Sequence, residues 1–164
     1  MSQISSVVGV VAGLLRGEGG LQTNIDALAA AETLPSVNLT DRQVITQNVP
    51  ADLAERSTAG KYPCVHVYCE KVTNLLREKF RTFSGEVGMV IEIRVSTDRV
   101  EDLDAQVNLL VDAVTTTLDQ NRGDWGAGIF YGGGYEIGFA VVKHGGKNFL
   151  QTAKVTFNLE VSRN

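Results

Sequence analysis

The feature that most constrains this chain is a regular alternation of apolar and polar residues near its C-terminal end. Between residues 149 and 161, one face carries Phe149, Ala153, Val155, Phe157, Leu159 and Val161. A period of two predicts a β-strand with one buried face. At about 3.3 Å per residue the strand reaches roughly 43 Å, whereas a chain of this length has a radius of gyration near 15 Å. We therefore expect it to cross the whole domain.

A second long strand is predicted just before it, over residues 135–143. The two strands are joined at His144-Gly145-Gly146-Lys147, which is typical of a hairpin turn. Upstream, Gly132-Gly133-Gly134 separates residues 135–143 from a short strand at 129–131, and such a glycine run favours a kink, a bulge or a turn. The end of the chain is thus predicted to be a long antiparallel hairpin.

In the rest of the chain, the spacing of apolar residues predicts both helices and strands. Apolar residues at helical spacing predict helices over residues 4–15, 21–29 and 100–118, the last with a capping box formed by Asp98 and Glu101. Alternation predicts strands at 64–69 and 86–95, and a short one at 44–45. Residues 51–56 are expected to form a helical turn or two, and 57–61 an exposed loop.

This order predicts an α+β fold: a mostly antiparallel sheet with a long C-terminal hairpin, and helices packed on one face. The chain has 164 residues, 43% of them hydrophobic and 21% charged, which fits one domain over residues 1–164. Within it, residues 1–35 form a helical N-terminal segment, and residues 62–162 form the core sheet and the long helix.

The charge and the hydropathy of the chain disfavour two classes of partner, nucleic acid and membranes. The net charge of −4 disfavours a protein that holds nucleic acid through a broad basic face. The apolar run at residues 7–15 has no Lys or Arg before it and is too short to cross a bilayer, so it favours a buried or amphipathic helix over a signal peptide. We expect no membrane association.

Residues that could carry chemistry do not combine into a site. Cys64, His66 and Cys69 are zinc-type ligands, but on a strand Cys69 faces away from the other two, and two free cysteines suit a reducing compartment. Glycines at 126–128 and 132–134 lead into strands, whereas a phosphate loop leads into a helix. We therefore predict no metal, no cofactor and no enzyme activity.

One strand carries charged residues opposite its apolar face. Glu86, Glu92 and Arg94 alternate with the apolar residues of the strand at 86–95. Paired carboxylates can act as acid and base, but a solvated strand face is the preferred interpretation.

Two groups of residues are candidates for a contact surface. Arg77, Lys79 and Arg81 form a basic edge, which suits either nucleic acid or an acidic partner subunit. Trp125, Phe130 and Tyr131 cluster near the glycine-rich break, where aromatics serve either as core or as interface anchors.

Residues 62–161 resemble the tail-terminator, or tail-completion, proteins of long-tailed bacteriophages. The resemblance is carried by Tyr62-Pro63-Cys64-Val65-His66-Val67, by the strand 86–95 running into Ser96-Thr97-Asp98, by the helix that ends at Leu118, and by the terminal strand 149–161.

The resemblance implies a virion protein assembled in the host cytoplasm. Its copies would form a hexameric ring on the end of the tail tube, stop tube polymerisation and dock to the head-side connector, and DNA would pass through without specific recognition. Two alternatives remain: a head-completion or neck connector subunit of the stopper or adaptor type, and a small enzyme or ligand-binding domain with a closed apolar pocket.

Overall fold

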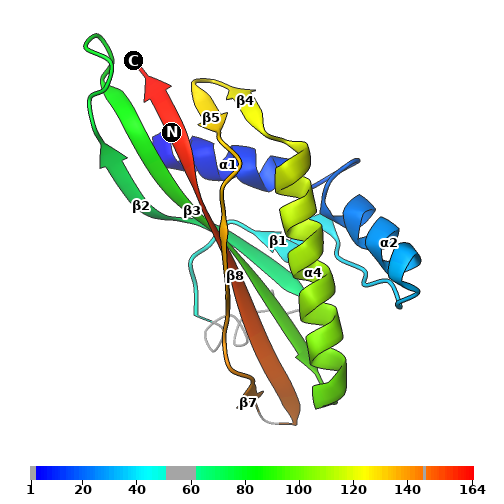
Figure 1. Ribbon diagram of the computed structural model, residues 1–164. Coiled ribbons are helices and arrows are strands. Elements are labelled where there is room, and N and C mark those ends of the chain that lie inside the picture. Colours follow the sequence, from blue (N-terminus) through cyan, green and yellow to red (C-terminus); the bar gives the residue numbers. More distant parts are fainter. Residues whose placement is uncertain (1–2, 51–61, 146) are drawn as a thin grey trace.

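The computed structural model describes residues 3–50, 62–145 and 147–164 (Figure 1). The helical elements are α1 (Gln3–Leu15), α2 (Leu21–Glu32), the 3-10 turn η1 (Asp41–Gln43) and α4 (Val100–Gln120). The strands are β1 (Val44–Ile45), β2 (Cys64–Asn74), β3 (Phe83–Thr97), β4 (Gly123–Gly126), β5 (Ile129–Tyr131), β6 (Glu136–Phe139), β7 (Lys143–Gly145) and β8 (Asn148–Arg163).

All of the described strands belong to one sheet in the order β1-β2-β3-β8-β5-β4, with β6 and β7 paired to β8. Among the described strands, only the short β1 runs parallel to its neighbour. The long strands β3 and β8 pair from Phe83↔Arg163 to Thr97↔Phe149, and they run the length of the molecule in Figure 1. The predicted α+β fold with a mostly antiparallel sheet and a long C-terminal hairpin is confirmed.

The helices lie on one face of the sheet, which we call the helix face. On β3 this face carries Val87, Met89, Ile91, Ile93 and Val95, all buried. Helix α4 packs across β3 and β8, and α1 packs on β2. Helix α2 packs on the outer side of α4, where Asn24 Nδ2 donates a hydrogen bond to Thr117 Oγ1 at 2.8 Å. The opposite side of the sheet is called the polar face below.

Most of the elements predicted from periodicity are present, with two differences in detail. The strand expected over residues 135–143 is divided into β6 and β7, although the backbone N–H of Ala140 still donates to the carbonyl of Thr152 at 2.9 Å. The predicted capping box on α4 is wrong, because the helix begins at Val100 and leaves Arg99 at the cap with no side-chain hydrogen bond. The helical turn and loop expected over residues 51–61 lie outside the described residues.

No helix in the described part of the chain combines the length and the hydropathy that a transmembrane span requires.

Candidate assembly interface

The basic edge lies in the loop between β2 and β3, which we call the hairpin tip (residues 75–82). A turn at its end is closed by a hydrogen bond from Arg81 N to Glu78 O at 3.3 Å. Arg81 also forms an ion pair with the Glu78 carboxylate at 3.1 Å, and Arg77 turns back to Glu86 at 2.8 Å. Lys79 forms no ion pair with any described residue. Two of the three predicted cations are thus tied to carboxylates of the same chain.

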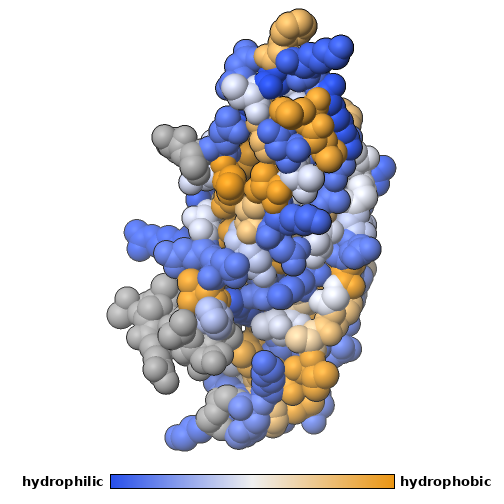
Figure 2. All heavy atoms as spheres, turned by 90° about the vertical axis from the view of Figure 1, so that its left-hand side faces the viewer, coloured by the Kyte–Doolittle hydropathy of each residue, from blue (hydrophilic) through white to orange (hydrophobic). Residues whose placement is uncertain are grey.

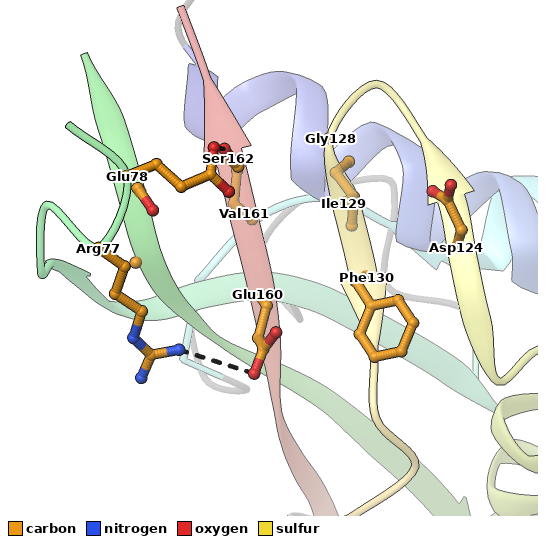
Figure 3. A pocket seen from close by; sticks show the side chains of 11 residues that line it. Arg77, Glu78, Asp124, Gly128, Ile129, Phe130, Glu160, Val161 and Ser162 are labelled. Carbon is orange, nitrogen blue, oxygen red and sulfur yellow. Dashed lines mark hydrogen bonds and ion pairs between the residues drawn. The ribbon is translucent and has the colours of Figure 1, made fainter. Parts of the chain in front are cut away.

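The structure brings Arg77 and Phe130 to one cavity of about 460 Å³ at the end of the sheet. Figure 3 shows them with Glu160 between them, and Arg77 Nη1 lies 3.6 Å from Glu160 Oε1. Phe130 is paired with Glu160 across β5 and β8, and its ring is partly exposed. Residues 53 positions apart in sequence therefore line the same hollow, whose wall combines an aromatic ring with acidic and basic groups.

The other two aromatic candidates, Trp125 on β4 and Tyr131 on β5, pack toward the core. The rings of Trp125 and Tyr131 have centroids 5.4 Å apart, and Tyr131 meets Phe157 edge-on at 5.5 Å. Tyr131 is fully buried, and its hydroxyl has no hydrogen-bond partner among the described residues. Burial raises the pKa of Tyr131 to about 12. Tyr131 is buried and cannot contact a partner directly, whereas Phe130 is exposed and can.

A second exposed apolar surface was not predicted from the sequence. Strand β6 pairs with β8 alone among the described strands, so its outer edge is open. We call β6 and the two residues that follow it the β6 edge (residues 136–141). Its apolar side chains are exposed, with Phe139 at 54% and Val141 at 85%, and Ile137 also accessible. The regular alternation that identifies a strand says nothing about whether another element covers it, which is why sequence reasoning missed this surface.

The opposite side of the sheet ends in β2, which the two-residue β1 covers only at Val65 and His66, and the rest of β2 is protected in another way. Strand β2 contains a bulge between Cys69 and Lys71, and the exposed residues there include Glu70 and Lys71. A bulge and charged side chains are the usual means by which an edge strand avoids pairing with other chains. The β6 edge lacks a bulge in its register with β8 and exposes apolar groups instead.

The polar face of β3 is buried at its centre, which corrects the expectation of a solvated face. Glu92 and Arg94 are both buried and form an ion pair, with Arg94 Nε 2.7 Å from Glu92 Oε2. Arg94 also donates to the carbonyl of Val49, and Lys154 on β8 lies 3.6 Å from Glu92. The charges are buried because residues 47–49 pass over this face, a contact that the strand pattern does not encode.

His66 completes this buried cluster. Its Nδ1 lies 3.0 Å from the carbonyl of Gln47, which can only accept, so Nδ1 carries the proton. Its Nε2 then accepts from Arg94 Nη1 at 3.3 Å. Burial lowers the pKa of His66, and the nearby Arg94 acts in the same direction, so the ring is neutral near pH 7. The polar groups of this cluster hydrogen-bond to one another and to the backbone of residues 47–49, so they attach that segment to the sheet.

The zinc-type residues are separated as their spacing predicts. Cys64 pairs with Arg94 and lies on the polar face, whereas Cys69 pairs with Met89 of the helix face. Burial raises the pKa of the Cys64 thiol to about 11. Within the described residues, no three His, Cys, Asp or Glu side chains are grouped as a metal site.

Comparison with known proteins gives no further guide to this surface. The sequence matches no protein-family model and no curated protein.

Proposed function

We propose that this chain is a structural subunit of a bacteriophage tail, which assembles into a ring at the end of the tail tube, stops tube polymerisation and docks to the head-side connector. The observation that carries the proposal is the open, apolar β6 edge. A monomer gains nothing from exposing Phe139 and Val141 on an unpaired strand, because such an edge invites association with other chains. A subunit that works in an assembly needs a surface of this kind.

The two sides of the sheet differ in a way that favours a ring. Beyond the two-residue β1, one side of the sheet ends in β2, which is blunted by its bulge and its charges, whereas β6 on the opposite side is open. Contacts between different surfaces of identical copies are heterologous, and they close into a ring when the rotation between copies permits. A tube end needs such a closed assembly, since a ring that offers no further growth surface ends polymerisation.

The proposed role also fits what the polar residues do. His66, Glu92 and Arg94 are bound to one another and to the backbone of residues 47–49. A ring that caps a tube and joins it to a head requires no catalytic residue, metal or cofactor. The net charge of −4 suits a lumen through which DNA passes without being held.

Deleting the gene from the phage that encodes it tests the proposal. Electron micrographs of the lysate are expected to show headless tails of variable, excessive length, and a plasmid copy of the gene is expected to restore joined particles of normal length. Tails of normal length beside unattached heads would instead assign the chain to the neck connector. Normal, infectious particles would overturn both assignments.

A further inference from the structure

The hairpin tip presents its most exposed side chains on a fixed turn. Lys79 and Phe80 are the two corner residues of the turn closed by Arg81 N and Glu78 O, and Phe80 is 96% exposed. In Figure 2 apolar side chains are visible toward the upper end of the molecule, where the tip lies.

The tip is held in place by several contacts. Ser162 Oγ donates to Glu78 at 2.9 Å, and Asn74 Nδ2 donates to the carbonyl of Thr82 at 3.1 Å. Arg77 is tied to Glu86 at 2.8 Å. These contacts fix the turn, and the turn holds the Phe80 side chain in solvent. Less conformational entropy is therefore lost when the phenyl group of Phe80 is immobilised in a contact.

The β6 edge offers the complementary features. Glu136 pairs with Thr156 and faces the polar side, whereas Ile137 and Phe139 pair with Val155 and Ala153, which belong to the helix face. Glu136 forms no ion pair with any described residue, and it lines a hollow of about 390 Å³ together with Glu86 and Glu160. Among the described residues, Arg77 forms ion pairs with two of these carboxylates, Glu86 and Glu160.

The corner of the tip, at Phe80, and Phe139 of the same molecule lie toward opposite ends of the sheet. Phe139 lies opposite Ala153 of β8, whereas Phe83, where the tip joins β3, lies opposite Arg163 at the far end of the same strand. Ala153 and Arg163 are ten positions apart on β8, a separation of about 33 Å. A contact between these two surfaces therefore requires a second copy of the chain.

We propose that the hairpin tip of one copy binds the β6 edge of the next copy. Phe80 packs on Ile137 and Phe139, and Lys79 forms an ion pair with Glu136. This inference rests on the proposed ring and names the contact that builds it. The two corner side chains of the tip are one aromatic and one cation, and the two sides of the β6 edge are apolar and acidic. A turn that straddles the edge places its aromatic side chain on the apolar side and its cation on the acidic side. The complementary charges then fix the register of the tip along the edge.

Two substitutions separate the halves of the contact. Phe80→Asp blocks the tip and leaves the edge intact, and Phe139→Asp blocks the edge and leaves the tip intact. Both side chains are exposed, so circular dichroism and the melting temperature are expected to match the wild type. Ile4→Asp is the matched control, because Ile4 is 42% exposed on α1 and belongs to neither surface.

Sedimentation of the purified proteins gives the result. Wild type and Ile4→Asp are expected to assemble, and each blocked variant alone is expected to remain a monomer. A mixture of the two blocked variants retains one good tip and one good edge, so it is expected to form a heterodimer and nothing larger. Assembly of the blocked variants like wild type would overturn the tip-to-edge contact and leave the ring standing. A wild type that stays monomeric at every concentration, both alone and with purified tail tubes, would overturn the tip-to-edge contact and the ring of copies together.

Charge reversal tests the polar half. Lys79→Glu and Glu136→Lys are each expected to weaken assembly of the full-length protein, and the double variant is expected to recover most of it. Glu32→Lys, an exposed change on α2, is expected to have no effect. Equal weakening by the double variant and the two single variants would remove the Lys79–Glu136 pair from the contact.

Discussion

Arg94 Nε lies 2.7 Å from Oε2 of Glu92, two positions away on β3, and both side chains are buried. The same guanidinium donates to the carbonyl of Val49. A charge pair on a strand face usually belongs to solvent, but here residues 47–49 close over it. The pair therefore links the N-terminal part of the chain to the centre of the sheet.

Removing one partner of this pair is expected to be costly. Arg94→Met leaves the Glu92 carboxylate buried with only Lys154, at 3.6 Å, and leaves the carbonyl of Val49 without that donor. We expect the free energy of unfolding, measured with urea, to fall by about 3–5 kcal/mol. The control is Arg122→Met, which breaks a solvent-exposed pair with Asp119 and is expected to leave the free energy of unfolding almost unchanged. Similar small losses for both variants would contradict a structural role for the buried pair.

His66 predicts a pH dependence of stability. Its pKa is lowered in the folded chain, chiefly by burial and also by Arg94, so the unfolded chain binds a proton more readily. The neutral ring contributes its full stability above the unfolded pKa, and this contribution is lost as the pH falls through about 6.5 toward the folded pKa.

We therefore expect wild type to lose more stability than His66→Gln between about pH 7.5 and about pH 5. Urea unfolding at several pH values measures the difference, and an NMR titration of the ring gives the direction of the shift independently. Parallel stability curves for the two proteins over this range would show that His66 is not buried as a neutral group.

Cys64 is expected to be almost inert to alkylation in the folded protein. Burial raises the pKa of its thiol from 9.0 to about 11. At about pH 8 its thiolate fraction is then about a hundredth of that in the unfolded chain. Iodoacetamide labelling of a Cys69→Ser variant, followed by mass spectrometry with and without urea, measures this single thiol. Equal labelling rates in the two conditions would contradict the burial of Cys64.

Gly128 is required for the turn between β4 and β5. It has φ +74°, and a Cβ there would lie 1.9 Å from the carbonyl oxygen of Ser162. Gly126 has a similar φ of +80° but open space around it. We expect Gly126→Ala to cost about 1–2 kcal/mol from the left-handed backbone alone.

Gly128→Ala is expected to add a further loss of about 1–3 kcal/mol, because the new methyl group must push β8 away from the turn. The comparison by thermal unfolding isolates the clash from the backbone strain. Equal losses in the two variants would show that the turn is not packed against Ser162.

The elements with an unbroken period were predictable from sequence. The stripe along α4 and the alternation in β3 and β8 depend only on local spacing and on burial of one face, and they gave the fold class. The predicted N-cap of α4 was wrong because the helix begins one residue later than a cap at Asp98 requires, which places Arg99 and not Asp98 at the cap position.

The candidate surface was predictable only in part. The basic edge and Phe130 lie at the surface, but Tyr131, the next residue on β5, is buried because alternate residues on a strand face opposite ways. Two further features depend on how distant segments are arranged: residues 47–49 cover Glu92 and Arg94, and none of the described strands pairs with the outer edge of β6. No local pattern records either of them.

The mass of the protein in solution, measured by sedimentation equilibrium with the protein alone and then with purified tail tubes, tests the central claim most directly. We expect a closed assembly of about six times the 17.7 kDa chain, either free or on the tube ends. A single 17.7 kDa species that neither self-associates nor binds tubes would contradict it.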